Sequence, residues 1–232
     1  MNVIQQNIEE VKRRIAEACA RAGRDPSEVK LLMATKTIAP DWILQAFECG
    51  ELLIGENKVQ ELAEKYEALS AVPHRAHFIG HLQTNKIKDV IQYADCIESV
   101  DRFDLAEKLA RRLRFEGKTI DVLIQVNTSA EETKSGCAPE EALSLIKQVS
   151  AFPDLRIKGL MTIGLFSSDT EKVRACYRLL KNIQEDCIKL ALPNVEMAVL
   201  SMGMSGDFEI AIEEGSTEVR VGTSIFGERV YH

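Results

Sequence analysis

Residues 31–40, "LLMATKTIAP", form a short apolar run that ends on Lys36, with a threonine on each side of the lysine. Lysine is costly to bury and is usually left to solvent. A parallel barrel, however, places its chemistry at the C-terminal tips of its strands. The segment therefore allows two interpretations of Lys36, a solvated strand end or a reactive amine.

Similar strand-like runs alternate with helix-like segments along the whole chain, and most are near-continuously apolar, as in strands covered on both faces. The predicted strands are residues 30–35, 52–55, 76–80, 95–100, 121–127, 156–162, 195–201 and 217–222. The clearest predicted helices are residues 101–117, 138–152 and 168–190. The first begins with Asp101 at the capping position, the last begins with Ser168 and Asp169, and the middle one has Pro139 in its first turn.

An extra helix is predicted at the N-terminus, ending at Gly23, with an apolar stripe of Ile4, Ile8, Val11 and Ile15. Eight strand–helix units in a chain of this size predict an α/β fold, a single (β/α)8 TIM barrel domain over residues 1–232. An open doubly wound sheet is the alternative. We favour the barrel because no G-x-G-x-x-G motif opens any strand–helix turn.

The composition limits the possible classes of function. A chain of 232 residues that is 45% hydrophobic can bury a large core, and no low-complexity run suggests a linker. A net charge of −7 argues against a nucleic-acid partner. No apolar stretch could span a membrane, and no signal-peptide core is present. The six scattered cysteines form no CxxC or metal-ligand spacing, so we expect a cytoplasmic protein with reduced thiols.

Polar residues gather at the predicted strand tips, where capping residues would also be found. For Lys36, strand alternation places Leu32 and Ala34 on the same side, and Met33 and Thr35 on the other. If the side of Lys36 faces the barrel axis, partial desolvation lowers the pKa of its amine and makes Schiff-base chemistry possible. A lysine that turns into solvent is the alternative.

Small and hydroxyl residues follow the last two strands, in "LSMGMSGDFEIAIEEG" and "VRVGTSIFGER". These residues are Ser201, Gly203, Ser205, Gly206, Gly222, Thr223 and Ser224. They let backbone N–H groups and hydroxyls approach an anion, and the loops after strands 7 and 8 are the usual phosphate site of a TIM barrel. Tight capped turns are the alternative. We favour a phosphate-bearing ligand.

Arg220 lies between Val219 and Val221, so alternation points it inward if the valines pack on helices. A guanidinium there needs a partner, either a ligand or a core ion pair with Glu218 or Glu56.

His77 and His81 are four residues apart, but on a strand this spacing is too long for shared ligation. With no third ligand apparent, we predict no metal site. We expect His81 in a loop or at a pocket rim, and Glu131, Glu132 and Lys134 in a solvated, charged loop.

The chain resembles the pyridoxal phosphate homeostasis protein family, which has the fold of the alanine racemase N-terminal barrel. The motifs that carry the resemblance extend from about Ala34 to Arg229 and are "ATK", "GENKVQE", "HFIGHLQTNK", "VNTSAEETKSG", "GLMTIG", "LSMGMSGDFEIAI" and "EVRVGTSIFG". The resemblance implies that Lys36 forms the internal aldimine with pyridoxal phosphate and that Arg220 faces the pyridine nitrogen. It further implies phosphate contacts or cofactor proximity for Ser201, Met202, Gly203, Ser205, Gly222, Thr223, Asn57 and His81, and a second cofactor-engaging lysine in Lys134.

The resemblance leads us to expect a protein that binds pyridoxal phosphate on Lys36, buffers this reactive aldehyde and hands it to apo-enzymes. A guanidinium cannot protonate the pyridine nitrogen, so the ring would be a weaker electron sink than with an aspartate partner. The tyrosines lie in predicted helices or at the terminus, and the chain ends at His232 without the second domain of alanine racemases. We therefore expect a monomer without efficient racemase activity.

Two alternatives stay open at this point. One is a weak racemase-type enzyme that uses pyridoxal phosphate on amino acids, with a base supplied by His81 or a cysteine. The other is a Schiff-base aldolase that binds a sugar phosphate without any cofactor, and that would not need Arg220 at ring height.

Overall fold

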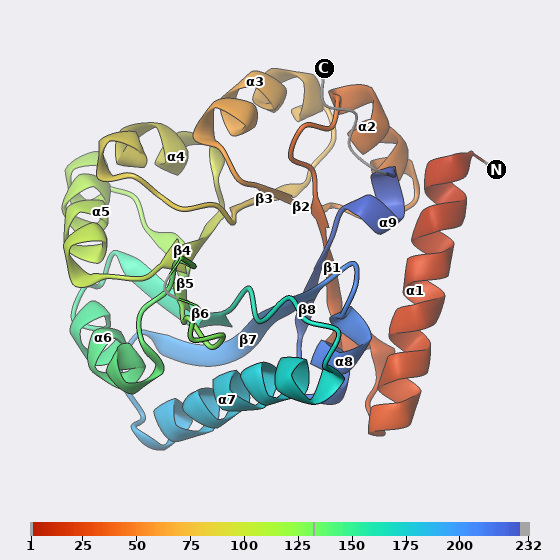
Figure 1. The fold of residues 1–232 in the computed structure, drawn as a ribbon. Coiled ribbons are helices and arrows are strands. Elements are labelled where there is room, and N and C mark those ends of the chain that lie inside the picture. Colours follow the sequence, from red (N-terminus) through yellow and green to blue (C-terminus); the bar gives the residue numbers. More distant parts are fainter. Residues whose placement is uncertain (1, 132, 228–232) are drawn as a thin grey trace.

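Eight parallel strands close into a barrel in the computed structural model, which describes residues 2–131 and 133–227. The strands pair in chain order, and the last pairs back onto the first, with helices around the outside (Figure 1). The predicted (β/α)8 barrel is therefore confirmed, and the open sheet is wrong. The strands are β1 (Lys30–Ala34), β2 (Leu53–Glu56), β3 (Arg75–Phe78), β4 (Cys96–Val100), β5 (Ile120–Gln125), β6 (Leu155–Met161), β7 (Val195–Met204) and β8 (Glu218–Val221).

The predicted strands correspond to these eight, with small shifts at their ends. The largest difference is in β7, which was predicted to end at Ser201 but continues to Met204. The pairing register between β7 and β8 shifts between these two residues. Such an irregularity lets one strand carry extra residues and bend at its tip, so the end of β7 lies within the loop cluster that the sequence analysis singled out.

Helices cover the outer face of the barrel. Those of the described residues are α1 (Val3–Ala22), α2 (Pro40–Glu48), α3 (Val59–Leu69), α4 (Ile87–Tyr93), α5 (Phe103–Glu116), α6 (Ala142–Val149), α7 (Thr170–Lys189), α8 (Phe208–Glu213) and α9 (Thr223–Phe226), with 3-10 turns η1 (Pro26–Glu28), η2 (Thr84–Lys86) and η3 (Pro139–Glu141). Asp169 caps α7 as predicted, accepting from Lys172 N. Asp101 does not cap α5, because its carboxylate instead binds the side chain of Arg102, which occupies the cap position.

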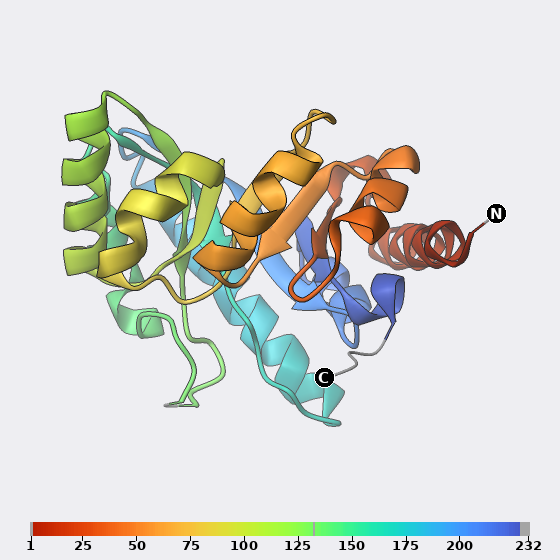
Figure 2. The same cartoon turned by 90° about the horizontal axis from the view of Figure 1, so that it is seen from above.

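The N-terminal helix α1 lies outside the ring of helices, beside α2, α8 and α9 (Figures 1 and 2). Its predicted stripe is buried, and Gly23 ends it in the left-handed conformation with φ 65°, which favours glycine. Among the described residues, no helix combines the length and apolar character that a membrane crossing needs.

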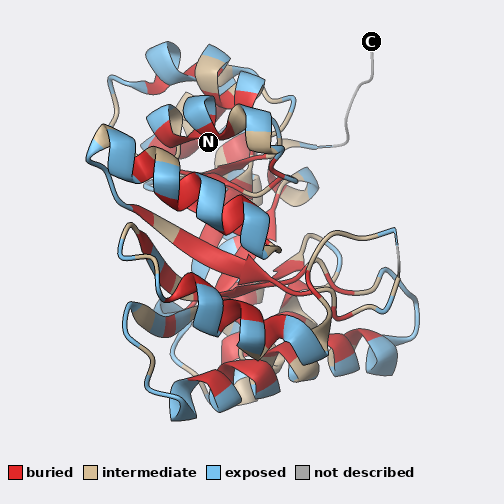
Figure 3. Ribbon diagram, turned by 90° about the vertical axis from the view of Figure 1, so that its left-hand side faces the viewer, coloured by how far each residue is buried: buried red, intermediate tan, exposed pale blue. Residues whose placement is uncertain are grey.

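The strands are largely buried, whereas each helix buries one face and exposes the other (Figure 3). The main core lies between strands and helices. A second, smaller cluster lies inside the barrel and contains Cys96, Leu123 and Met161. Buried polar residues fill much of the remaining interior, and they include His77, Glu98, Ser201, Glu218 and Arg220. The interior of the barrel therefore contains both an apolar cluster and a group of buried polar side chains.

Candidate functional site

A cavity of about 380 Å³ lies at the C-terminal tips of the strands, and we call it the strand-tip cavity. Six of the ten predicted site residues line it, namely Lys36, Asn57, Ser205, Arg220, Gly222 and Thr223. Apolar side chains complete the wall, among them Ile38, Ile79, Met161, Ile163, Leu165 and Phe226. The cavity therefore combines a lysine, an arginine, hydroxyls and an apolar wall at the position where TIM barrels place their chemistry.

Lys36 follows β1 and lies on the inner side of the barrel. Ala34 and Lys36 both line the strand-tip cavity, whereas Thr35 is fully buried on the opposite side. The predicted alternation of this strand is thus confirmed, and Lys36 is half-buried and not a fully solvated end-stop. The next residue, Thr37, has φ 64°, a left-handed conformation that is unfavourable for a β-branched residue.

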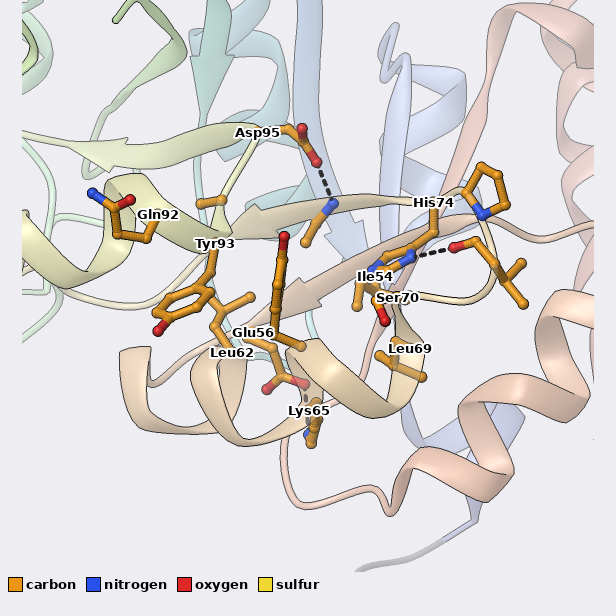
Figure 4. A pocket seen from close by; sticks show the side chains of 15 residues that line it. Ile54, Glu56, Leu62, Lys65, Leu69, Ser70, His74, Gln92, Tyr93 and Asp95 are labelled. Carbon is orange, nitrogen blue, oxygen red and sulfur yellow. Dashed lines mark hydrogen bonds and ion pairs between the residues drawn. The ribbon is translucent and has the colours of Figure 1, made fainter. Parts of the chain in front are cut away.

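A buried ionic cluster contacts the backbone beside Lys36. Figure 4 shows two of its members, Glu56 at the end of β2 and Lys65 on α3. Lys65 Nζ donates to Glu56 Oε1 at 2.6 Å and to Thr35 O at 2.8 Å, and it lies 3.2 Å from Glu61 Oε2. Burial raises the pKa of Glu56, and the Lys65 ammonium opposes this. Burial acts on Glu61 too, but the hydrogen bond from Thr37 N and the Lys65 charge outweigh it and lower the pKa of that carboxyl.

Arg220 points into the barrel, as predicted. Its two terminal nitrogens donate to Ser201 Oγ at 2.7 Å and to Thr162 O at 2.6 Å. Glu56, one of the two carboxylates considered as its ion-pair partner, pairs with Lys65 instead. The guanidinium is therefore oriented by neutral oxygen atoms, and it also lines the strand-tip cavity.

Ser201 links Arg220 to a group of buried titratable residues below it. Its hydroxyl donates to Glu98 Oε2 at 2.6 Å, and Glu98 Oε1 lies 2.7 Å from His77 Nδ1. Burial opposes ionisation of Glu98, but the hydrogen bond with His77 and the charges of His77 and Arg220 outweigh it and lower its pKa. Burial and the charge of Glu98 raise the pKa of Glu218 well above its usual range. The chain from Arg220 to His77 is thus a continuous polar network.

The contact of His77 with two carboxylates escaped the sequence analysis. His77, Glu98 and Glu218 offer ligand atoms within 4.8 Å of one another, which is compatible with a metal ion. His81, the neighbour considered in sequence, lies elsewhere. Each of the three is an inward-facing polar residue on a strand, which is the signal that could have revealed the group.

The two phosphate-type loops lie next to each other, since Ser205 Oγ accepts a hydrogen bond from Gly222 N at 3.3 Å. Packing explains part of their composition. Met202 is buried in the main core, and Gly203 has φ 95° with a hypothetical Cβ only 2.6 Å from Ala211 Cβ. A Cβ on Gly222 would lie 2.9 Å from Ala34 O. Ser201, Met202 and Gly203 therefore do not line the cavity, although they support the loops that do.

His81 and Lys134 lie outside the wall of the strand-tip cavity. The side chain of His81 is 51% exposed and lies 3.8 Å from Asp101. Lys134 Nζ donates to Gly164 O at 2.7 Å and pairs with Glu131. The charged loop predicted here is thus partly anchored, and its third member, Glu132, lies outside the described residues.

Asp207 is a residue of the cavity wall that the sequence analysis did not single out. Its carboxylate accepts from Tyr177 Oη at 2.7 Å and from Met204 N at 2.7 Å. Burial, together with the Asp207 charge, raises the pKa of Tyr177. Asp207 is part of the sequence motif "SGD", but the motif does not reveal its partner, because Tyr177 lies in the distant helix α7.

Comparison with known proteins identifies the family to which this chain belongs. The sequence profile described as "Alanine racemase, N-terminal domain" matches residues 2–230. The pyridoxal phosphate homeostasis protein of Aquifex aeolicus is 43% identical over 226 residues, covering 97% of this chain and 98% of the relative.

Two solved structures are similar over nearly the whole chain. A protein of unknown function from Bifidobacterium adolescentis is 41% identical with a TM-score of 0.93, covering 97% of this chain and 94% of that one. PipY of Synechococcus elongatus, solved with pyridoxal phosphate bound, is 31% identical with a TM-score of 0.79, covering 92% of this chain and 100% of that one. The chain therefore belongs to the alanine racemase N-terminal domain family and, within it, to the pyridoxal phosphate homeostasis proteins.

Proposed function

We propose that this chain binds pyridoxal 5'-phosphate in the strand-tip cavity as an aldimine on Lys36, and that it acts in intracellular pyridoxal phosphate homeostasis without efficient catalysis. The observation that carries the proposal is that an amine, Lys36, and an inward guanidinium, Arg220, line one cavity. The name of the Aquifex aeolicus relative and the ligand in the PipY structure support the same cofactor for this chain.

The groups around the strand-tip cavity suit each part of this cofactor. The Lys36 amine can react with its aldehyde, and hydroxyls and backbone N–H groups near Ser205 and Thr223 can bind its phosphate. Apolar side chains such as Ile163 can cover its ring. A volume of about 380 Å³ suits a small ligand. When bound, the cofactor supplies an electrophilic carbon and an electron-withdrawing ring.

Low catalytic power is part of the proposal, and two features of the site support it. An arginine guanidinium keeps its protons at ordinary pH, so Arg220 can donate a hydrogen bond to a ring nitrogen but cannot protonate it. Racemisation also needs acid/base groups on both faces of the substrate carbon. Among the described residues, no tyrosine lines the cavity, and the Tyr177 hydroxyl is bound to Asp207. Exchange of an amino acid's α-hydrogen with solvent deuterium should therefore be slow. Rapid exchange that Lys36→Ala abolishes would favour the racemase-type alternative.

The proposal extends to the state of the protein in the cell. We propose a single barrel domain over residues 1–232, a monomer, a cytoplasmic location, and transfer of the cofactor to apo-enzymes. Six free thiols support a reducing compartment. Sedimentation at several protein concentrations tests the monomer, and recovery of activity by an apo-enzyme mixed with the loaded protein tests transfer.

The first experiment is the visible absorption spectrum of the protein loaded with pyridoxal phosphate, followed by borohydride reduction and peptide mapping. We expect an absorption band that is absent from Lys36→Ala, with the reduced label on Lys36. Lys30→Ala is the matched control, because Lys30 is an exposed lysine at the opposite end of the same strand. A wild type that cannot be loaded, or a label on another lysine, would contradict the proposal.

A further inference from the structure

The backbone on both sides of Lys36 is held by charged side chains from the outer face of the barrel. We infer that Lys65, acting with Glu56 and Glu61, is a positioning group that fixes the Lys36 backbone and thereby aims its amine into the strand-tip cavity. This inference rests on the proposed function, since it concerns the reaction of that amine. None of the three charged residues is expected to touch the cofactor.

On the N-terminal side of Lys36, the contacts converge on Thr35. Lys65 Nζ donates to Thr35 O at 2.8 Å, and Thr35 Oγ1 donates to Glu56 Oε1 at 2.6 Å. Glu56 also accepts from Lys65 at 2.6 Å. Thr35 N meanwhile donates to Gly55 O at 3.0 Å. The carbonyl, amide and hydroxyl of the residue before Lys36 are therefore all bound, which leaves its peptide plane little freedom.

On the C-terminal side, Glu61 Oε2 accepts from Thr37 N at 2.6 Å and lies 3.2 Å from Lys65 Nζ. Thr37 has φ 64°. A β-branched residue in this region is strained relative to the right-handed form. The strained turn persists only where surrounding contacts determine it, and the bond to Glu61 is such a contact. One lysine thus connects the two anchors of Lys36.

Burial shows why packing alone does not account for Lys65. The residue is 8% exposed and its partner Glu56 is 0% exposed. A buried ion pair of this kind is seldom better for stability than apolar side chains of similar size. A charged pair does, however, fix the positions of the atoms to which it hydrogen-bonds. Here the constrained atoms belong to the residues flanking the reactive lysine.

Rates of covalent reactions depend steeply on such placement. A displacement of roughly 1 Å can cost about a hundredfold in rate. Lys65→Met, which keeps the length of the side chain and removes its charge, should therefore slow the reaction of Lys36 with pyridoxal phosphate by about 10–100-fold. Non-covalent binding should change much less, because among the described residues no hydrogen bond or ion pair joins the loops around Ser205 and Thr223 to the cluster.

The test compares two measurements on the full-length protein. The first is the stopped-flow rate of the absorption change on mixing with pyridoxal phosphate. The second is the affinity for pyridoxine 5'-phosphate, which has the ring and phosphate but no aldehyde. We expect Lys65→Met to slow the first and to leave the second within about twofold. Lys65→Arg, which keeps a charged donor, should recover part of the rate, and Lys30→Met, on an exposed lysine of the same strand, should be unaffected.

A second variant covers the case in which Lys65→Met does not fold. Glu61→Ala removes the acceptor of Thr37 N from a less buried position, and it should slow the same reaction. Wild-type rates in both variants would overturn the inference. So would a loss of pyridoxine phosphate affinity as large as the loss of rate, because that indicates general damage to the site. A wild type that binds pyridoxine phosphate but never reacts with the aldehyde would overturn the proposed function itself.

Discussion

Replacing Ser201 with alanine should destabilise the fold more than replacing Ser99, another buried serine, with alanine. The Ser201 hydroxyl accepts from Arg220 at 2.7 Å and donates to Glu98 at 2.6 Å, and all three residues are buried. Hydrogen bonds to charged groups contribute roughly 1.5–3 kcal/mol each. Because a water molecule can occupy part of the vacated space, we take the lower end for both bonds, about 3 kcal/mol.

For a chain of this length, 1 kcal/mol corresponds to roughly 2–4 °C in melting temperature. Ser201→Ala should therefore melt about 6–12 °C below the wild type, and urea denaturation should give the matching free energy. Ser99→Ala is the control, since Ser99 is equally buried but its hydroxyl has no hydrogen-bond partner among the described residues. That variant should be no less stable than the wild type, because alanine removes a buried hydroxyl that has no partner. Equal effects of the two substitutions would refute the role assigned to the network.

Two further predictions concern residues of β8 and β7. Burial and the charge of Glu98 raise the pKa of Glu218, so its neutral form adds stability that is complete below the unfolded pKa of about 4.3 and is lost as pH rises through the folded pKa. Glu218→Gln, which stays neutral, should thus lose less stability than the wild type toward alkaline pH, measured as the urea midpoint. Gly203→Ala should cost about 1–3 kcal/mol by urea denaturation, since Gly203 has φ 95° and a Cβ would clash with Ala211. Gly206→Ala is its control, because a Cβ there meets nothing within 4 Å; equal costs would contradict the packing explanation.

Period-two alternation explains why so much of this site could be predicted from the sequence. Once a strand is placed, the side on which each residue lies follows without knowledge of its neighbours. This is how Ala34 was assigned to the side of Lys36, and how Arg220 was pointed inward between two valines. The order of strands in a TIM barrel then brought the tips of β1, β7 and β8 together.

The partners of these residues could not be predicted in the same way, because they depend on tertiary contacts. Lys65 lies in a helix segment, "VQELAEKYEAL", whose charges look like those of any solvated helix face. Its burial follows from the packing of α3 over β1 and β2. Likewise, the Ser201 hydroxyl was assigned toward a phosphate, but the register shift between β7 and β8 places it inside the barrel on Arg220 and Glu98.

The two cationic residues of the cavity wall, Lys36 and Arg220, are held from opposite sides, and strand geometry explains the difference. Lys36 lies two residues past the end of β1, beyond the strand pairing, and its side chain lines the cavity, so the contacts from the outer face act on its backbone. The adjacent residues face outward, and this is where Thr35 meets Glu56 and Lys65. Arg220 lies within its strand, where the backbone is already fixed by pairing and the outward neighbours are apolar. Its long side chain is the flexible part, and it is bound from inside by Ser201 and Thr162. In each case polar contacts constrain the part of the residue that strand pairing does not fix, which is the backbone of Lys36 and the side chain of Arg220. Buried charged residues therefore lie outside the barrel near Lys36 and inside the barrel near Arg220.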